Sequence, residues 1–428
     1  MAGRARVSKL VVGGSAKLDG EVTVGGSKNA SLPILAATLL ATKPVTLHRV
    51  PAISDVAVML DILRGFGMKV EGESGTVTLD PTGIKASAVP DELARSLRAS
   101  ILMLGPAIAR FGEYASVHPG GDLIGRRPLD THFRALETLG ASVEHDHARY
   151  TVTGKDLAGT TVFLEEASVT ATENLMMAAT AAPGTTVIKN AASELHVRDL
   201  AHFLTKLGAK ISGAGTNKVT VEGGAPLGAA EHEVRADEIE TGTFMMAAAL
   251  CGGEVAIKQV DLEHFGSIPL KLREAGVNFT ATDTEVVVKG PHQLRGNDMK
   301  VEFWPGFPTD LQPPYTVMMT QADGMSLIHD HMYEGRFFYT DKLVSMGANI
   351  TMADPHRIIV SGPTKLRGKE LESPDIRAGI TLLVAALVAE GETTIDHAEL
   401  IDRGYERIDE RLRDLGASVT RVEESPTA

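Results

Sequence analysis

The chain is poor in cysteine, in aromatic residues and in long apolar runs. Its 428 residues include one cysteine, Cys251, and aromatic residues make up 4% of the chain. A single cysteine excludes an internal disulfide and a cysteine metal cluster, which favours a reducing cytoplasm. No apolar run approaches the roughly 18 residues that span a bilayer, so we expect no membrane insertion. The N-terminal MAGRARVSKLVV lacks a continuous apolar stretch, which argues against a secretory signal.

Positive charge is also scarce. The chain has 42 basic and 55 acidic residues, with a formal net charge of -13. Such a chain repels phosphate backbones, so we expect no nucleic-acid partner. Hydrophobic residues at 43% and charged residues at 23% are typical of a globular protein. The length predicts two domains of roughly 200 residues each.

The histidines do not predict a metal site. The sequence HDH occurs twice, at His145/His147 and His329/His331, without a third ligand at the usual spacing. The chain also lacks a P-loop, a dinucleotide-binding fingerprint and a nucleophile elbow. We therefore expect no bound metal.

One unit recurs along the chain at intervals of about 70 residues. In each copy an apolar helical segment ends in a glycine and a strand-like segment follows. The glycines are Gly67, Gly140, Gly208, Gly276, Gly347 and Gly416. Glycine suits this position because helices often end with a residue in the left-handed conformation. The pattern predicts an α/β (α+β) fold built from six such units, three in each of two domains.

The repeat boundaries predict an inserted domain. We expect residues 1–27 plus 236–428 to form the domain that contains both termini, and residues 28–235 to form the inserted domain with the loop of Asp122. The leading strand VSKLVVGG is expected to pair with the last repeat. Two lobes joined by two crossings predict a cleft and a hinge.

The segment GGSKNASLPILAA, residues 25–37, departs from the repeat. A helix is expected to begin near Asn29 with Lys28 at its mouth. A helix N-terminus beside a lysine suits a phosphate or a carboxylate. The alternative is a helix capped by Ser27 or Asn29 with a solvated lysine.

A second departure is HPGGDLIGRRPLDTHF, residues 118–133. Three glycines surround Asp122, and Arg126 and Arg127 follow. A glycine-rich loop that carries an acid and paired guanidinium groups is typical of an active-site lid. The alternative is a surface turn with a salt bridge from Asp122 to an arginine.

A third departure is FWPGFPTDLQPPY, residues 303–315, which holds four of the 20 prolines. Its stiff backbone fixes Asp310, and a fixed carboxylate suits a general base. The alternative is Asp310 as the N-cap of a following helix.

Two arginine-bearing segments lie near the C-terminus. In SPDIRAG, Asp375 is expected to cap the alanine-rich helix that begins near Arg377. In IDRGYERI, Arg403 precedes a glycine and is a candidate anion ligand.

These motifs together resemble the UDP-N-acetylglucosamine 1-carboxyvinyltransferases, a group within the enolpyruvyl transferase family. The resemblance runs from Val11 to Glu423 and includes GGSKNA, PGGDLIGRRPLD, SVTATEN, IETGTF, FPTDLQ, EGRF, DIRAG and IDRGYERI. The shikimate-pathway enolpyruvyl transferases are similar, but their N-x-G-T-x-x-R segment is absent here. The resemblance implies a two-domain inside-out α/β barrel of six repeats. It also implies transfer of the enolpyruvyl group of phosphoenolpyruvate to the 3-hydroxyl of UDP-N-acetylglucosamine, the first committed step of peptidoglycan precursor synthesis.

The resemblance further implies roles for individual residues. Lys28, Asp122 and Asp310 would be catalytic, and phosphoenolpyruvate would contact Lys28, Asn29, Arg127 and Arg403. The UDP-sugar would contact Arg98, Arg127, Pro128, Leu129, Asp130, Thr131, Ser168, Val169, Thr170, Asp310 and Met332, with Arg336, Asp375 and Arg377 in support. Asp122 stands where many members carry a cysteine proton donor, and that cysteine is the residue that fosfomycin alkylates. An aspartate is a far poorer nucleophile than a thiolate, so we expect fosfomycin resistance.

The chemistry of the transfer needs an acid, a base and fixed positive charge. Asp122, Asp310 and the cluster of Lys28, Arg127 and Arg403 supply these, so we expect no cofactor. Arginines favour an ionised aspartate, so we expect Asp122 to hold a proton only in the closed, ligand-filled site.

Three positions depart from the family pattern: Glu166 replaces a lysine, Leu102 a tryptophan and Leu400 a histidine. They leave open the same transfer onto a different nucleotide or nucleotide sugar. A non-enzymatic six-repeat clamp or scaffold is the remote alternative. A clamp would place its basic residues at helical spacing, whereas here they lie in glycine- and proline-rich loops. We expect a cytoplasmic enzyme, with a monomer favoured, that acts on two small-molecule substrates.

Overall fold

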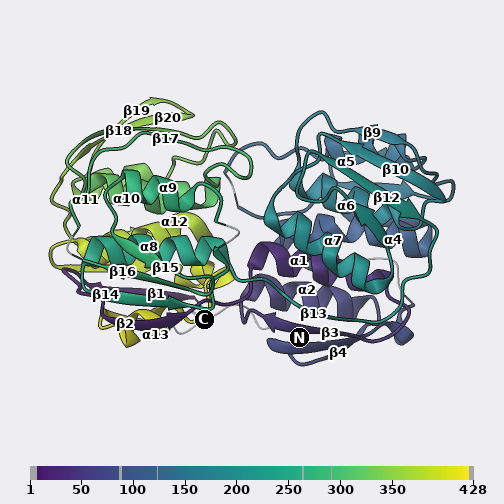
Figure 1. Ribbon diagram of the computed structural model, residues 1–428, viewed down its shortest axis with the longest axis horizontal. Coiled ribbons are helices and arrows are strands. Elements are labelled where there is room, and N and C mark those ends of the chain that lie inside the picture. Colours follow the sequence, from purple (N-terminus) through teal and green to yellow (C-terminus); the bar gives the residue numbers. More distant parts are fainter. Residues whose placement is uncertain (1–6, 86–88, 123, 263–264, 291, 424–428) are drawn as a thin grey trace. The chain divides into compact units, whose positions relative to one another are not determined.

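The computed structural model describes residues 7–85, 89–122, 124–262, 265–290 and 292–423 (Figure 1). Contacts divide the chain into two compact units. Unit 1 consists of Met1–Gly25, Asp122–Arg126 and Ala236–Ala428, and unit 2 consists of Gly26–Gly121 and Arg127–Arg235. The short segment Asp122–Arg126, expected in the inserted domain, is grouped with unit 1 in this division. Each unit has its own hydrophobic core.

The described residues of unit 1 form three four-stranded sheets. In spatial order, their strands are β21 (Glu370–Glu372), β22 (Glu392–Asp396), β1 (Ser8–Gly13) and β23 (Ser418–Glu423); β15 (Phe279–Ala281), β16 (Glu285–Lys289), β14 (Glu254–Lys258) and β2 (Gly20–Thr23); and β17 (Met299–Lys300), β18 (Gly324–His329), β20 (Arg357–Gly362) and β19 (Asn349–Asp354). The antiparallel pairing of β1 with β23 confirms that the leading strand joins the last repeat.

The helices of unit 1 are α8 (Glu238–Cys251), α9 (Ile268–Glu274), α10 (Gln312–Thr320), α11 (Thr340–Met346), α12 (Ile376–Val388) and α13 (Ile408–Asp414). Helix α12 is buried from Ile376 to Leu387, and α10 is buried along its whole length. Helices that are buried on every face form a core and not a surface layer. Figure 1 shows these two helices, with α8, between the sheets of the unit.

The described residues of unit 2 likewise form three sheets and a set of helices. Its sheets consist of β11 (Lys210–Ser212), β12 (Lys218–Gly223), β10 (Gly184–Lys189) and β9 (Thr161–Phe163); β13 (Ala230–Glu233), β3 (Val45–Val50), β5 (Gly75–Asp80) and β4 (Lys69–Glu71); and β6 (Glu113–Val117), β8 (Arg149–Thr153) and β7 (Ser142–His145). Its helices are α1 (Lys28–Ala37), α2 (Ser54–Gly65), α3 (Asp91–Ser96), α4 (Leu104–Phe111), α5 (Asp130–Thr138), α6 (Val169–Ala179) and α7 (Leu195–Leu207). The fold of both units is mixed α/β.

The six predicted helix-stop glycines all have positive φ. The values run from 91° at Gly67 and Gly276 to 118° at Gly208. This backbone conformation is strained for a residue with a Cβ atom, so the prediction from the glycine spacing is confirmed. None of the helices in the described ranges combines the length and apolar character that a bilayer crossing requires.

Candidate functional site

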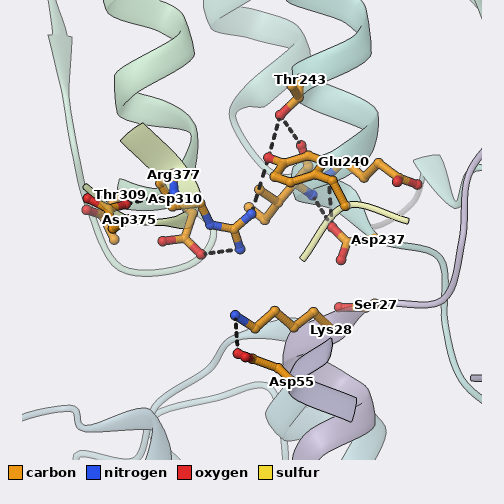
Figure 2. Close-up of polar contacts among 12 residues, drawn as sticks. Ser27, Lys28, Asp55, Asp237, Glu240, Thr243, Thr309, Asp310, Asp375 and Arg377 are labelled. Atoms are coloured by element: carbon orange, nitrogen blue, oxygen red, sulfur yellow. Dashed lines mark hydrogen bonds and ion pairs between the residues drawn. The ribbon is translucent and has the colours of Figure 1, made fainter. Parts of the chain in front are cut away.

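Lys28 is the first residue of α1, in unit 2. Ser27 caps this helix and accepts a hydrogen bond from the backbone N–H of Ala30 at 3.4 Å, which confirms Ser27 as the cap. The alternative interpretation expected a solvated lysine, and this expectation is wrong. The Nζ of Lys28 lies 2.8 Å from Oδ2 of Asp55, and both side chains are largely buried (Figure 2). Asp55 comes from the first turn of α2. No motif in the sequence points to Asp55, because only the packing of α2 against α1 brings it to Lys28.

The turn before Lys28 requires glycine at position 26. A Cβ atom there would lie 1.8 Å from the carbonyl oxygen of Arg49, and Arg49 itself has a φ of 57°. The backbone of this turn is therefore fixed by a close approach that no other residue permits.

Several predicted UDP-sugar ligands gather in unit 2. Arg98 begins the 3₁₀ helix η3 (Arg98–Met103), and its Nη2 donates to the carbonyl oxygen of Arg127 at 2.5 Å. The Thr131 hydroxyl donates to Oε1 of Glu166 at 3.1 Å. Ser168 caps α6 and accepts from the backbone N–H of Ala171. Hydrogen bonds thus connect Arg98 with Arg127 and Thr131 with Glu166. Glu166 is one of the three residues that depart from the family pattern.

His132 also belongs to this group, although no pattern in the sequence indicates a role for it. Its Nε2 lies 2.9 Å from Oγ1 of Thr170. Burial, together with the charge of Arg98, lowers the pKa of His132 to about 3. The imidazole is therefore neutral at physiological pH and fixes the orientation of the Thr170 hydroxyl without adding charge.

Asp310 is clamped by two arginines in unit 1. It lies in the 3₁₀ helix η5 (Thr309–Leu311), and α10 has Leu311 as its N-cap, so the interpretation of Asp310 as an N-cap is wrong. Its Oδ1 accepts from Nη2 of Arg336 at 2.5 Å, and its Oδ2 accepts from Nη2 of Arg377 at 2.8 Å (Figure 2 shows the second contact). Each arginine is only 5% exposed, whereas the Asp310 side chain is 26% exposed. A partly exposed carboxylate is thus held by two buried guanidinium groups.

The two arginines are themselves fixed. Asp375 caps α12 by accepting from the backbone N–H groups of Arg377 at 2.8 Å and Ala378 at 2.9 Å, which confirms its predicted capping role. Burial lowers the pKa of the Arg377 guanidinium, but Asp310, Tyr405 and Asp237 together outweigh this effect, and the pKa lies above its ordinary value. The Nε of Arg336 donates to the Thr309 hydroxyl at 3.2 Å, and that hydroxyl donates to Asp330 at 2.6 Å. Met332, a predicted UDP-sugar ligand, donates its backbone N–H to Asp330.

Asp122 forms an ion pair with Arg403, within unit 1. Nη1 of Arg403, the last residue of the 3₁₀ helix η6 (Ala398–Arg403), donates to Oδ1 of Asp122. The loop is anchored further by the backbone N–H of Arg126, which donates to Glu334 at 3.0 Å. The salt bridge that the sequence left as an alternative is therefore present, and its arginine lies far along the chain instead of beside Asp122.

Helix α6 carries a buried carboxyl shortly after the Ser168–Thr170 segment. Glu173, on α6, is 1% exposed, and its Oε1 has no hydrogen-bond partner among the described residues. Burial raises the pKa of Glu173 well above its usual range, and the nearby Glu194 adds to the shift. The side chain is therefore a neutral acid within the core.

Glu173→Gln is expected to stabilise the protein increasingly as the pH rises. An unfolded glutamate titrates near 4.3, whereas folded Glu173 keeps its proton to higher pH, so the parent loses up to about 1.4 kcal/mol of stability per pH unit above that value. Glutamine carries no such proton. Urea unfolding at three pH values from about 5 to 8 measures the difference. An exposed control, Glu222→Gln, should show no pH-dependent difference; the same flat result for Glu173→Gln would contradict the prediction.

Comparison with known proteins places these features in a family. Residues 12–412 match the model of the EPSP synthase (3-phosphoshikimate 1-carboxyvinyltransferase) family. The chain belongs to the 1-carboxyvinyltransferases. It is 44% identical over 425 residues to the UDP-N-acetylglucosamine 1-carboxyvinyltransferase of Bradyrhizobium diazoefficiens, covering 97% of this chain and 98% of that one. It is 44% identical over 419 residues to the protein of the same name from Solibacter usitatus, covering 97% of this chain and 100% of the relative.

Solved structures show the same fold for this 1-carboxyvinyltransferase. The enolpyruvyl transferase NikO from Streptomyces tendae matches with a TM-score of 0.88 and 23% identity, over 98% of this chain and 100% of that one. An EPSP synthase from Acinetobacter baumannii matches with a TM-score of 0.76 and 21% identity, over 97% of this chain and 100% of that one. At this identity the likeness concerns the fold alone.

Proposed function

We propose that this chain transfers the enolpyruvyl group of phosphoenolpyruvate to the 3-hydroxyl of UDP-N-acetylglucosamine and releases phosphate, which commits the sugar to peptidoglycan synthesis. The observation that carries the proposal is the Asp310 clamp. A carboxylate fixed at both oxygens and partly exposed is suited to accept a proton from a hydroxyl group. The names of the relatives at 44% identity support this acceptor.

The reaction proceeds by addition and elimination. Asp310 accepts the proton of the sugar 3-hydroxyl group while the hydroxyl oxygen forms a bond to the C2 carbon of phosphoenolpyruvate. In the same addition, Asp122 delivers a proton to the C3 methylene. The C2–O bond to phosphate then breaks as the new methyl group returns a proton to Asp122, and the departing phosphate takes up the proton held by Asp310. Every step is a proton transfer or a heterolytic C–O bond change, so the proposal requires no cofactor.

The ion pairs of the proposed site support a binding mode for the anionic substrate. Phosphoenolpyruvate contacts Lys28, Asn29, Arg127 and Arg403 in this proposal. Lys28 then shares its charge between Asp55 and the substrate, and Arg403 exchanges Asp122 for a substrate oxygen. Loss of the arginine from Asp122 allows that carboxyl to carry the proton that it donates.

The UDP-sugar contacts a second set of residues in this proposal, which shares Arg127 with phosphoenolpyruvate and includes the base Asp310: Arg98, Arg127, Pro128, Leu129, Asp130, Thr131, Ser168, Val169, Thr170, Asp310 and Met332, supported by Arg336, Asp375 and Arg377. The proposal also covers the repeat architecture, the location of the enzyme in the cell and its oligomeric state. The three sheets and central helices of each unit are taken as three repeats of one inside-out α/β barrel, and the enzyme acts in the cytoplasm as a monomer.

The same transfer onto a different acceptor is the second candidate. It is favoured by Glu166, an acid bonded to Thr131 where many members of the family have a lysine. Phosphate release from phosphoenolpyruvate with and without UDP-N-acetylglucosamine separates the two. Release that needs UDP-N-acetylglucosamine supports the proposal, whereas release only with another acceptor would select the second candidate.

Lys28→Met is expected to raise the KM for phosphoenolpyruvate by about 10- to 100-fold, because a charge-assisted hydrogen bond contributes roughly 1.5–3 kcal/mol. The KM for the UDP-sugar should change little. A matched control is Lys17→Met, which also removes a lysine 2.8 Å from an aspartate oxygen, but at an exposed position. Equal effects of the two substitutions on the KM for phosphoenolpyruvate would contradict the assignment.

A further inference from the structure

A chain of hydrogen bonds leads from Asp310 into the core of unit 1. Arg377 uses Nη2 for Asp310, and its Nη1 donates to the hydroxyl oxygen of Tyr405 at 3.2 Å. The Tyr405 hydroxyl lies 3.0 Å from Oγ1 of Thr243, on α8. Tyr405 is fully buried, at 0% exposed. Figure 2 shows Thr243, Arg377 and Asp310 along this chain.

The direction of these hydrogen bonds follows from the number of protons. Thr243 has one hydroxyl proton, which it donates to the carbonyl oxygen of Ile239 at 2.8 Å. It therefore accepts from Tyr405, and the Tyr405 oxygen is left to accept from Arg377. Each group in the chain is satisfied, and such chains strengthen their members cooperatively.

We propose that Tyr405 is a positioning residue for the enolpyruvyl transfer, because its hydroxyl fixes the guanidinium plane of Arg377 and thereby the carboxylate of Asp310. A guanidinium held at both Nη atoms has no freedom to rotate about its terminal torsions. The second arginine of the clamp, Arg336, has an independent anchor at Thr309. The orientation of the Asp310 oxygen bound to Arg377 therefore depends on Tyr405. This inference rests on the proposed role of Asp310 as the group that accepts the hydroxyl proton.

Tyr405→Phe removes one oxygen atom and leaves Arg377, at 5% exposed, with an unsatisfied donor. We expect kcat to fall by about 10- to 100-fold, as for loss of a hydrogen bond to a charged group, while both KM values stay within about threefold. The matched control is Tyr339→Phe. Tyr339 is 2% exposed, and its hydroxyl bonds to Gln312 at 2.7 Å and Thr316 at 2.9 Å, on α10. Tyr339→Phe removes an equally buried hydroxyl and should leave kcat within about twofold of the value for the parent.

A crystal structure of Tyr405→Phe tests the inference independently of turnover. We expect the Arg377 to Asp310 contact to be lost or displaced while the Arg336 to Asp310 contact persists. An unchanged clamp, or a kcat equal to that of the parent, would overturn the inference. Equal losses of kcat in Tyr405→Phe and Tyr339→Phe would also overturn it, since they would indicate a general effect of a buried hydroxyl. If the parent enzyme itself releases no phosphate with UDP-N-acetylglucosamine, the proposed function fails, and the crystal structure still decides whether Tyr405 positions Arg377.

Discussion

Asp310→Asn is expected to lower kcat by about 10³-fold, because general base catalysis contributes typically 10²- to 10⁴-fold. The amide is close in shape to the carboxylate but has almost no basicity. It also turns one NH₂ group toward either Arg336 or Arg377, so a donor meets a donor in the clamp. The KM values should change much less than kcat, since the loss concerns proton transfer in the transition state.

The matched control for Asp310→Asn is Asp409→Asn. Asp409 is a buried carboxylate that also pairs with two arginines, Arg413 and Arg421, each at 3.1 Å, but it ties α13 to β23 and lies outside the proposed site. This substitution should lower the thermal midpoint and leave kcat of the folded enzyme within about twofold. Comparable losses of kcat in the two variants would indicate that Asp310 has a structural role only. Steady-state phosphate release, measured well below both thermal midpoints, makes the comparison.

The local parts of the fold were predictable from sequence because short-range physics determines them. The left-handed glycines, the Ser27 and Asp375 caps and the terminal strand pairing each depend on residues whose conformational preferences are strong. The fixed position of Asp310 was also predicted from sequence, since prolines beside a carboxylate indicate a fixed side chain.

The partners of these residues were harder to predict. Asp55 reaches Lys28 only through the packing of α2 against α1. Tyr405 reaches Arg377, and Thr243 reaches Tyr405, from segments that are distant in the sequence. The sequence showed that Asp122 had arginine neighbours, but it did not indicate that the distant Arg403 would be its partner. Side chains of ordinary type carry no local signal of such long-range pairing. What can be predicted from one sequence is therefore a candidate charged residue, and what the structure adds is the set of groups that contact it.

Fosfomycin is expected not to inactivate the parent enzyme covalently, whereas Asp122→Cys is expected to be inactivated at least about 100-fold faster. Inactivation requires a nucleophile that opens the epoxide by forming a bond to carbon, while the ring oxygen leaves carbon and takes up a proton. A carboxylate is a weak nucleophile for this step. A thiol at position 122 would lie beside Arg403, whose charge favours the reactive thiolate.

The native thiol serves as an internal control for this experiment. Burial raises the pKa of Cys251 to about 12, so it stays protonated and unreactive at neutral pH. Residual activity against time of incubation with fosfomycin, followed by mass spectrometry of the digested protein, should show one adduct in Asp122→Cys at the substituted position and none in the parent. Asp122→Ser, which supplies no thiol, should behave like the parent. A time-dependent adduct on Asp122 itself would contradict the prediction, because it would show that the carboxylate performs the ring opening for which a thiolate is considered necessary here.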